Sequence, residues 1–333
     1  MTIQEISDEY ERELLAEQER TERYVTRQYN ELMGRIAVVL ASNTPKRARE
    51  WQINAIIREA TLKIDLRIEK GIQNAWELSN QKQIVFLDKK LKGRTLPDNI
   101  RKVCYDPNKK ALDNFTKRTR KGLTISDRVW NTVDGVNRTV EAITAEGISK
   151  GEGAPKIARR LRKELRNPTL TEARGKGVYK SPLANTKRLA RTETNRSYRR
   201  SDIEGWKKSP QFLGFRIQLS ATQSKKVKAR CELCVKLQGV YPLEFVWDGW
   251  HPNCLCYTTP VIMTDDQFYE YMDMIEAGKD SKRAVEALRK RSGLVKKLPK
   301  EFTGWLKDNK DRVKKWTNKP YWYQDNPGMV KVR

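Results

Sequence analysis

Four of the five cysteines and the only histidine of this chain lie within 26 positions. They form the pair Cys231-x-x-Cys234 and, shortly after it, the run His251-Pro252-Asn253-Cys254-Leu255-Cys256. A Cys-x-x-Cys pair on a tight turn offers two thiolates to one ion, and a second short group of ligands can complete a tetrahedron. The pattern therefore predicts one structural Zn²⁺ site.

A tetrahedral structural site needs four ligands, and the sequence offers five. Cys231 and Cys234 are the first choices and Cys254 the third, while His251 and Cys256 compete for the fourth position. The spacing His251-x-x-Cys254 mirrors the first pair and favours the histidine; if Cys256 binds instead, His251 becomes a hydrogen-bond donor beside the site. Two other interpretations are reduced thiols packed without a metal and, in a small secreted domain, disulfides. The long chain without a signal peptide disfavours the second of these.

Composition favours long, solvated helices over one compact globule. Only 38% of the 333 residues are hydrophobic, 33% are charged, and no apolar run approaches the roughly 20 residues that a membrane span needs. We expect a mainly α protein with a small zinc-bound α+β module, in which long N-terminal helices precede a short antiparallel sheet. No membrane contact is expected.

The formal net charge of +26 is unevenly distributed. Positions 1–43 are acidic overall, whereas 156–200 and 281–333 are strongly basic. Each basic zone by itself is typical of a solvated helix surface, but together they favour a polyanionic partner such as double-stranded DNA. The predicted nucleic-acid-facing residues are Arg159, Arg160, Arg162, Lys163, Arg199 and Arg200.

Hydrophobic periodicity predicts the order of the elements. Apolar residues recur at helical spacing, whereas 211–220 alternates with period two and predicts a strand, with 257–262 as its partner. The acidic first half of the opening helix has few apolar residues and is expected to project into solvent or onto a partner. Four regions are expected: an N-terminal helical hairpin at 1–92, a helical middle region with loops at 93–182, a core with the Cys/His module at 183–280, and a basic, aromatic tail at 281–333. Within the middle region, 167–182 is expected to be an exposed loop.

Several short motifs, in order, resemble the phage head morphogenesis family of minor head proteins. The resemblance covers roughly 142–259. The motifs that carry it are Ile148-Ser149-Lys150-Gly151, Ala190-Arg191-Thr192-Glu193, Cys231-x-x-Cys234 with Leu237-Gln238-Gly239, and His251-Pro252-Asn253-Cys254-x-Cys256. The last of these motifs is the most diagnostic. Family members often have an aspartate just before the first cysteine and an arginine inside the final Cys-x-Cys. This chain has Arg230 and Leu255 there, which puts any role of that aspartate in doubt.

The resemblance implies a minor capsid protein of a tailed phage. Its place would be the capsid interior near the portal, and the host cytoplasm during assembly. Its partners would be the portal protein, scaffold or major capsid protein, and the genomic double-stranded DNA. A free-standing zinc-ribbon nucleic-acid-binding protein is the alternative.

Arg191 and Glu193 admit two interpretations. One is a catalytic or DNA-contacting pair; the favoured one is a structural pair that ties its helix to the zinc-bearing sheet. The sequence contains no Walker motif, His-Glu-x-x-His motif or paired-carboxylate pattern, and no enzymatic activity is expected. The isolated Cys104 is given no role.

Overall fold

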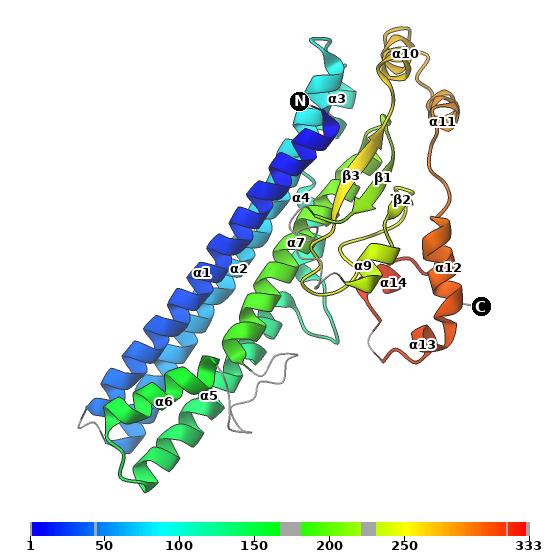
Figure 1. Ribbon diagram of the computed structural model, residues 1–333. Coiled ribbons are helices and arrows are strands. Elements are labelled where there is room, and N and C mark those ends of the chain that lie inside the picture. The colour runs from blue at the N-terminus through cyan, green and yellow to red at the C-terminus, as the bar shows by residue number, and fades with distance from the viewer. Residues whose placement is uncertain (1, 43–44, 167–180, 221–230, 318, 331–333) are drawn as a thin grey trace. The chain divides into compact units, whose positions relative to one another are not determined.

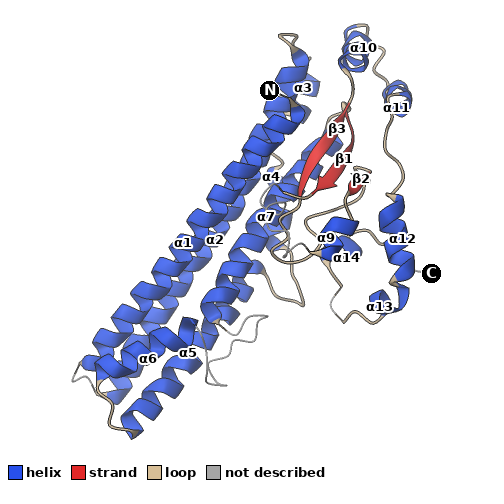
Figure 2. Ribbon diagram, in the orientation of Figure 1, coloured by secondary structure: helices blue, strands red, loops and turns tan. Residues whose placement is uncertain are grey.

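The protein is mainly helical with one small antiparallel sheet, as the sequence predicts (Figures 1 and 2). The computed structural model describes residues 2–42, 45–166, 181–220, 231–317 and 319–330. The exposed loop expected at 167–182 therefore lies almost wholly outside the described residues. Among the described residues, no helix combines the length and the apolar character required to cross a membrane.

The chain divides into two compact units, each assembled from segments that are distant in sequence. We call them the helical unit, Ala16–Gln73 with Asp113–Thr194, and the sheet unit, which holds Met1–Leu15, Asn74–Leu112 and Asn195–Arg333. Three long helices contribute residues to both units: α1 (Ile3–Ala41), α2 (Lys46–Leu91) and α7 (Pro182–Lys208).

The helical unit is built from the apolar faces that periodicity predicts. Within it α1 and α2 run antiparallel, since Arg67 reaches Glu17 at 2.7 Å while Arg35 reaches Glu59 at 2.8 Å. Helix α5 (Ile125–Ser149) is followed by α6 (Ala154–Arg166). The buried stripes comprise Val25, Tyr29, Leu32 and Ile36 on α1, Ile53, Ile57, Ile64, Ile68 and Ile72 on α2, and Val129, Val133, Val136, Val140 and Ile143 on α5.

The sheet unit contains a three-stranded antiparallel sheet in the order β2-β1-β3. Strand β1 (Phe212–Gln218) lies between β2 (Gly239–Tyr241) and β3 (Tyr257–Ile262). The pairing of β1 with β3 confirms the two predicted strands. In the sequence, α9 (Glu232–Lys236) lies between β1 and β2, and the run from His251 to Cys256 lies between β2 and β3. Both groups of candidate ligands therefore fall in the connections of the sheet.

The N-terminal segment of α1 packs within the sheet unit, and the expectation that it projects away is wrong. Its capping box forms, with Glu5 N donating to Thr2 Oγ1 at 3.1 Å. Ile6 is only 2% exposed in the main core, and Gln4 donates to Tyr257 Oη at 2.7 Å. A few apolar residues are enough to dock this segment because its polar side chains bond directly to β3.

The basic, aromatic tail packs on the same core. It forms α11 (Lys282–Arg291), α12 (Lys300–Asp308), α13 (Lys310–Lys314) and α14 (Tyr321–Gln324). Trp322, 1% exposed, meets Trp250 edge to face with ring centroids 5.5 Å apart and donates its indole N–H to the Trp250 carbonyl. These rings therefore fill a packing site inside their own unit.

The remaining described helices are α3 (Asp98–Cys104), α4 (Lys109–Lys117), which buries Phe115, and α10 (Asp265–Glu276), which begins with a capping box between Thr264 and Gln267. Residues of α3 and α10 belong to a second apolar cluster. Cys104 packs against the cluster that includes α10 residues, and burial raises the pKa of its thiol. It is a packed thiol rather than an activated one.

Candidate metal centre

The first ligand pair is positioned by the start of α9. Cys231 is the N-cap residue, and its carbonyl accepts from Val235 N at 3.1 Å. Cys234 lies in the first helical turn and is buried. Residues three apart on a helix share one face, so the two thiols project to the same side.

The second ligand group is positioned by a turn. Cys254 N donates to the His251 carbonyl at 3.1 Å, and Asn253 between them has φ 60°. Proline at the second position and a residue with positive φ at the third are characteristic of a type II turn, and asparagine tolerates that conformation better than most residues. The Pro252-Asn253 dipeptide thus explains why His251 and Cys254 converge, a signal that the sequence interpretation did not use.

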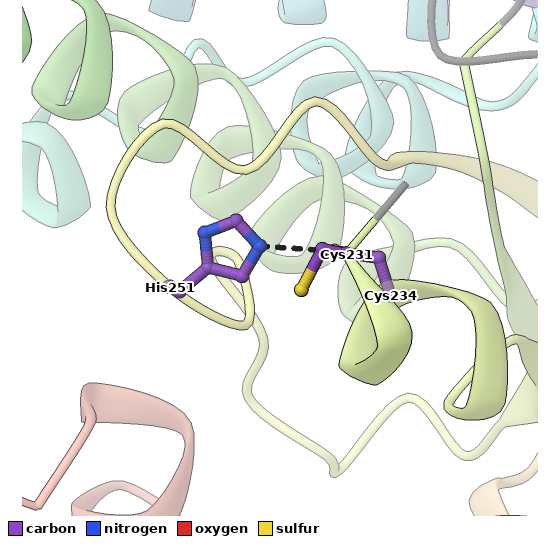
Figure 3. A group of neighbouring side chains, drawn as sticks. All are labelled: Cys231, Cys234 and His251. Carbon is purple, nitrogen blue, oxygen red and sulfur yellow. Dashed lines mark hydrogen bonds between the residues drawn. The ribbon is translucent and has the colours of Figure 1, made fainter. Parts of the chain in front are cut away.

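All five candidate ligands meet in two overlapping groups. In the first, the donor atoms of Cys231, Cys234 and His251 lie within 4.8 Å of one another; the second groups Cys234, Cys254 and Cys256 in the same way. Cys234 Sγ, common to both, lies 3.1 Å from His251 Nε2 and 3.8 Å from Cys254 Sγ. Figure 3 shows His251 on its loop facing the two cysteines of α9.

The histidine presents the nitrogen that a metal requires. His251 Nδ1 lies 2.7 Å from the Pro252 carbonyl oxygen, which only accepts hydrogen bonds, so this contact assigns the ring proton to Nδ1. The lone pair then lies on Nε2, the atom that faces Cys234 Sγ. A backbone carbonyl that fixes the tautomer in this way is the usual arrangement beside metal-binding histidines.

The thiols differ in burial and electrostatics. Cys234, Cys254 and Cys256 are at most 1% exposed, whereas Cys231 and His251 are half-buried. Contact with Cys254 and Cys256, together with burial, raises the pKa of Cys234. Burial also acts to raise the pKa of Cys254, but hydrogen bonds from the other two thiols and the charge of Arg199 outweigh it and hold that pKa low. A divalent metal bound here would compensate the charge of several thiolates and so favour deprotonation of the neighbouring thiols.

A buried arginine fixes the backbone of the buried cysteines. Arg199, 3% exposed on α7, donates to the carbonyls of Cys254 at 2.6 Å, Cys256 at 2.5 Å and Asp248 at 3.1 Å. One turn earlier, Asn195 donates to the same Cys254 carbonyl at 3.1 Å. These two α7 side chains hold the second ligand group against the helix.

Gly249 makes this approach possible. Its φ of 125° is one that residues with a side chain rarely adopt, and a Cβ there would lie 2.6 Å from Arg199 Nη1. The glycine therefore serves both the turn and the contact with the guanidinium.

One predicted DNA contact is corrected. Arg199 does not face nucleic acid, because its guanidinium is buried and bonded to backbone carbonyls. Its neighbour Arg200 is half-buried and paired with Glu204 at 2.9 Å and Asp325 at 3.6 Å. The spacing Asn195-x-x-x-Arg199 places both side chains on one helix face, but nothing in the sequence marks that face as buried.

The proposed structural pair Arg191 and Glu193 is also corrected, because each has partners other than the sheet. Arg191 pairs with Glu22 of α1 at 2.5 Å. Glu193 is fully buried and pairs with Arg118 at 2.8 Å and Arg128 at 3.0 Å. Both residues are structural, but they link α7 to other helices of the helical unit.

The basic helix α6 retains an exposed cationic face. Arg159, Arg162 and Lys163 are exposed. Arg160 is half-buried and pairs with Glu152 at 2.7 Å and with Glu146. Of the predicted nucleic-acid contacts on this helix, three are therefore accessible and one is engaged within the unit.

The donor set fits zinc: four thiols and an imidazole with its free lone pair on the right nitrogen are the ligands that structural Zn²⁺ prefers. The chain was compared with protein-family models, curated proteins and solved structures. None of them matches. Function must therefore be inferred from the motifs and the geometry of this chain.

Proposed function

We propose that this chain is a minor capsid protein of a tailed phage, of the head morphogenesis family. In this proposal it associates with the portal protein and the capsid interior during head assembly and DNA packaging or ejection. Scaffold or major capsid protein and the genome are its other neighbours, and its Cys/His cluster holds a structural zinc ion.

The observation that supports the proposal most is that two motifs of the resemblance, distant in sequence, act together. Cys231-x-x-Cys234 and the run from His251 to Cys256 share one ligand cluster. Directly after the Ala190–Glu193 run on α7 come Asn195 and Arg199, whose side chains hold the Cys254 backbone. Motifs with one joint structural task are expected to recur together in a family.

The metal's task in this proposal is structural. When bound, it would supply a cross-link between α9 and the turn before β3, in a segment with little regular secondary structure. The residues of the chain orient that link through the His251 tautomer and the Arg199 bonds.

The exposed α6 cations supply a nonspecific DNA contact. Arg159, Arg162 and Lys163 present side chains to solvent without a base-reading motif around them, so affinity should come from phosphate contacts and counterion release. Fluorescence anisotropy with two unrelated duplexes should give equal affinities that fall steeply with salt. Replacing all three residues by alanine should reduce the salt slope by up to about 3. Undetectable or salt-insensitive binding would remove DNA from the proposal.

Co-expression with the portal protein tests the assembly role. If a portal or terminase gene lies beside the gene for this chain, as the proposal expects, that portal protein should co-purify with the full chain. The protein should also be present in purified heads. A zinc-ribbon DNA-binding protein predicts the opposite pattern, with DNA binding but neither portal association nor incorporation into heads.

A further inference from the structure

We propose that the buried thiols of Cys234, Cys254 and Cys256 are permanent metal ligands, and that His251 and Cys231 alternate as the fourth. This inference rests on the proposed metal site and assigns its ligands. It differs from the order expected from spacing, in which Cys231 was a first choice and Cys256 competed with His251.

The starting point is that the cluster has one donor too many. Neither group of three completes a tetrahedron, while the two groups together offer five donors. Because Cys234 belongs to both groups, it is a ligand in every arrangement that uses either one. The choice therefore lies among the other four residues.

The inner ligands are fixed in place. Cys254 and Cys256 are 1% and 0% exposed, and both of their carbonyls are held by Arg199. Cys256 also directly precedes β3, whose register with β1 begins at Tyr257. Moving either thiol away from Cys234 would break buried hydrogen bonds to a charged group, so these two residues stay within reach of the metal.

The outer ligands are held more loosely. Cys231 is half-buried and caps a five-residue helix without a side-chain capping bond. His251 is half-buried, and its ring is anchored through Nδ1 to the adjacent residue, Pro252. Both donor atoms lie within 4.8 Å of Cys234 Sγ and of each other, and both residues are more exposed than the inner three, so a side-chain rotation would exchange one donor for the other.

Charge favours His251 in the resting state. Three thiolates and a neutral imidazole leave the zinc site with one negative charge fewer than four thiolates, and Arg199 is a cation that bonds the cluster's backbone. In a buried site the less charged arrangement has the smaller desolvation cost. Cys231 is then the reserve ligand, and the exposed side becomes the route by which metal enters.

Cobalt substitution in single and double variants of the full chain tests this assignment. Co²⁺ occupies tetrahedral zinc sites, and its thiolate charge-transfer absorption grows with the number of bound thiolates. Cys231→Ser should keep one metal per chain and the wild-type spectrum. His251→Asn should also keep the metal, with stronger charge-transfer absorption because Cys231 replaces the imidazole. Each single change should weaken zinc affinity by no more than roughly a hundredfold.

The double variant Cys231→Ser/His251→Asn and the single variants Cys234→Ser and Cys256→Ser should bind metal far more weakly than either outer variant. Cys104→Ser, outside the cluster, is the matched control, and circular dichroism shows which variants stay folded. Loss of the metal in His251→Asn alone or Cys231→Ser alone would overturn the alternation, as would a wild-type spectrum in Cys256→Ser. A wild-type chain that binds no metal would instead refute the proposed zinc site itself.

Discussion

Glu193 in the helical unit and Arg199 in the sheet unit are buried in opposite ways, although the sheet unit also buries a charge pair, Lys82 with Asp202 at 2.6 Å. In the helical unit, the buried Glu193 carboxylate forms ion pairs with Arg118 and Arg128. The helices of this unit have regular apolar stripes. In the sheet unit, Arg199 is buried against backbone carbonyls of an irregular segment. The difference shows that helices, which satisfy their own backbone, need side chains only to pair with one another, whereas loops need side chains to satisfy their carbonyls.

The largest loss of stability should follow the removal of Trp322, whose indole packs the tail onto the core of the sheet unit. Trp322→Ala deletes a buried indole that packs on Trp250 and Phe302 and should cost about 4 kcal/mol of unfolding free energy. Chemical denaturation measures this loss. Trp51→Ala, at a position 72% exposed in the helical unit, is the control and should leave the stability nearly unchanged. Equal effects would mean that the tail is not part of the core.

The charge pairing of the helical unit is tested by Glu193→Gln, which keeps the side chain's shape but removes its charge. Two arginines that are 15% exposed then lose their partner, and the cost should be about 3 kcal/mol. Glu19→Gln breaks an exposed pair with Arg23 and should have no measurable effect. A neutral result at Glu193 would show that its burial contributes nothing to this unit.

The carbonyl-binding arginine of the sheet unit has a neighbour that serves as its control. Arg199→Met removes the guanidinium donor from three carbonyls, of which that of Cys254 keeps its bond from Asn195, and should destabilise by about 2 to 3 kcal/mol, with weaker retention of the proposed zinc. Arg200→Met removes partly exposed ion pairs and should cost less than about 1 kcal/mol. If both variants retain zinc equally, Arg199 does not hold the cluster.

Glu11 in the sheet unit should make the unfolding free energy depend on pH. Burial, with the nearby Asp8 adding to it, raises the pKa of Glu11 from about 4.5 to about 7, although Arg199 and Lys82 oppose the shift. Between those values the folded chain keeps a proton that the unfolded chain releases, so the stability from this group is present below about pH 4.5 and is lost as pH rises through 7.

Glu11→Gln should therefore remove a decline of up to about 3 kcal/mol across that range, seen when wild-type and variant are denatured at a series of pH values. Parallel pH profiles for the two proteins would contradict the shift.

Much of the fold follows from local patterns, and the parts that do not are those fixed by contacts distant in sequence. The spacing of Ile64, Ile68 and Ile72 predicts helix α2 from its own residues, and the alternation over 211–220 predicts strand β1 in the same way. The five candidate ligands were found the same way, because their spacing is itself the signal.

The roles of charged residues could not be read from the sequence. Arg199 and Arg200 are adjacent and chemically identical, yet one is buried against a loop some fifty positions later and the other reaches surface carboxylates. Likewise, the partners of Glu193 precede it by 65 and 75 positions. Burial of a charge depends on what tertiary structure brings to it, which spacing along one helix does not encode.

The metal content of the purified chain tests the central claim most directly. Elemental analysis should find one zinc per chain, and a chelator should lower the melting temperature of the chain, because the proposed zinc ion would cross-link α9 to the turn before β3. A chain without zinc, whose melting is unchanged by the chelator, would contradict the account.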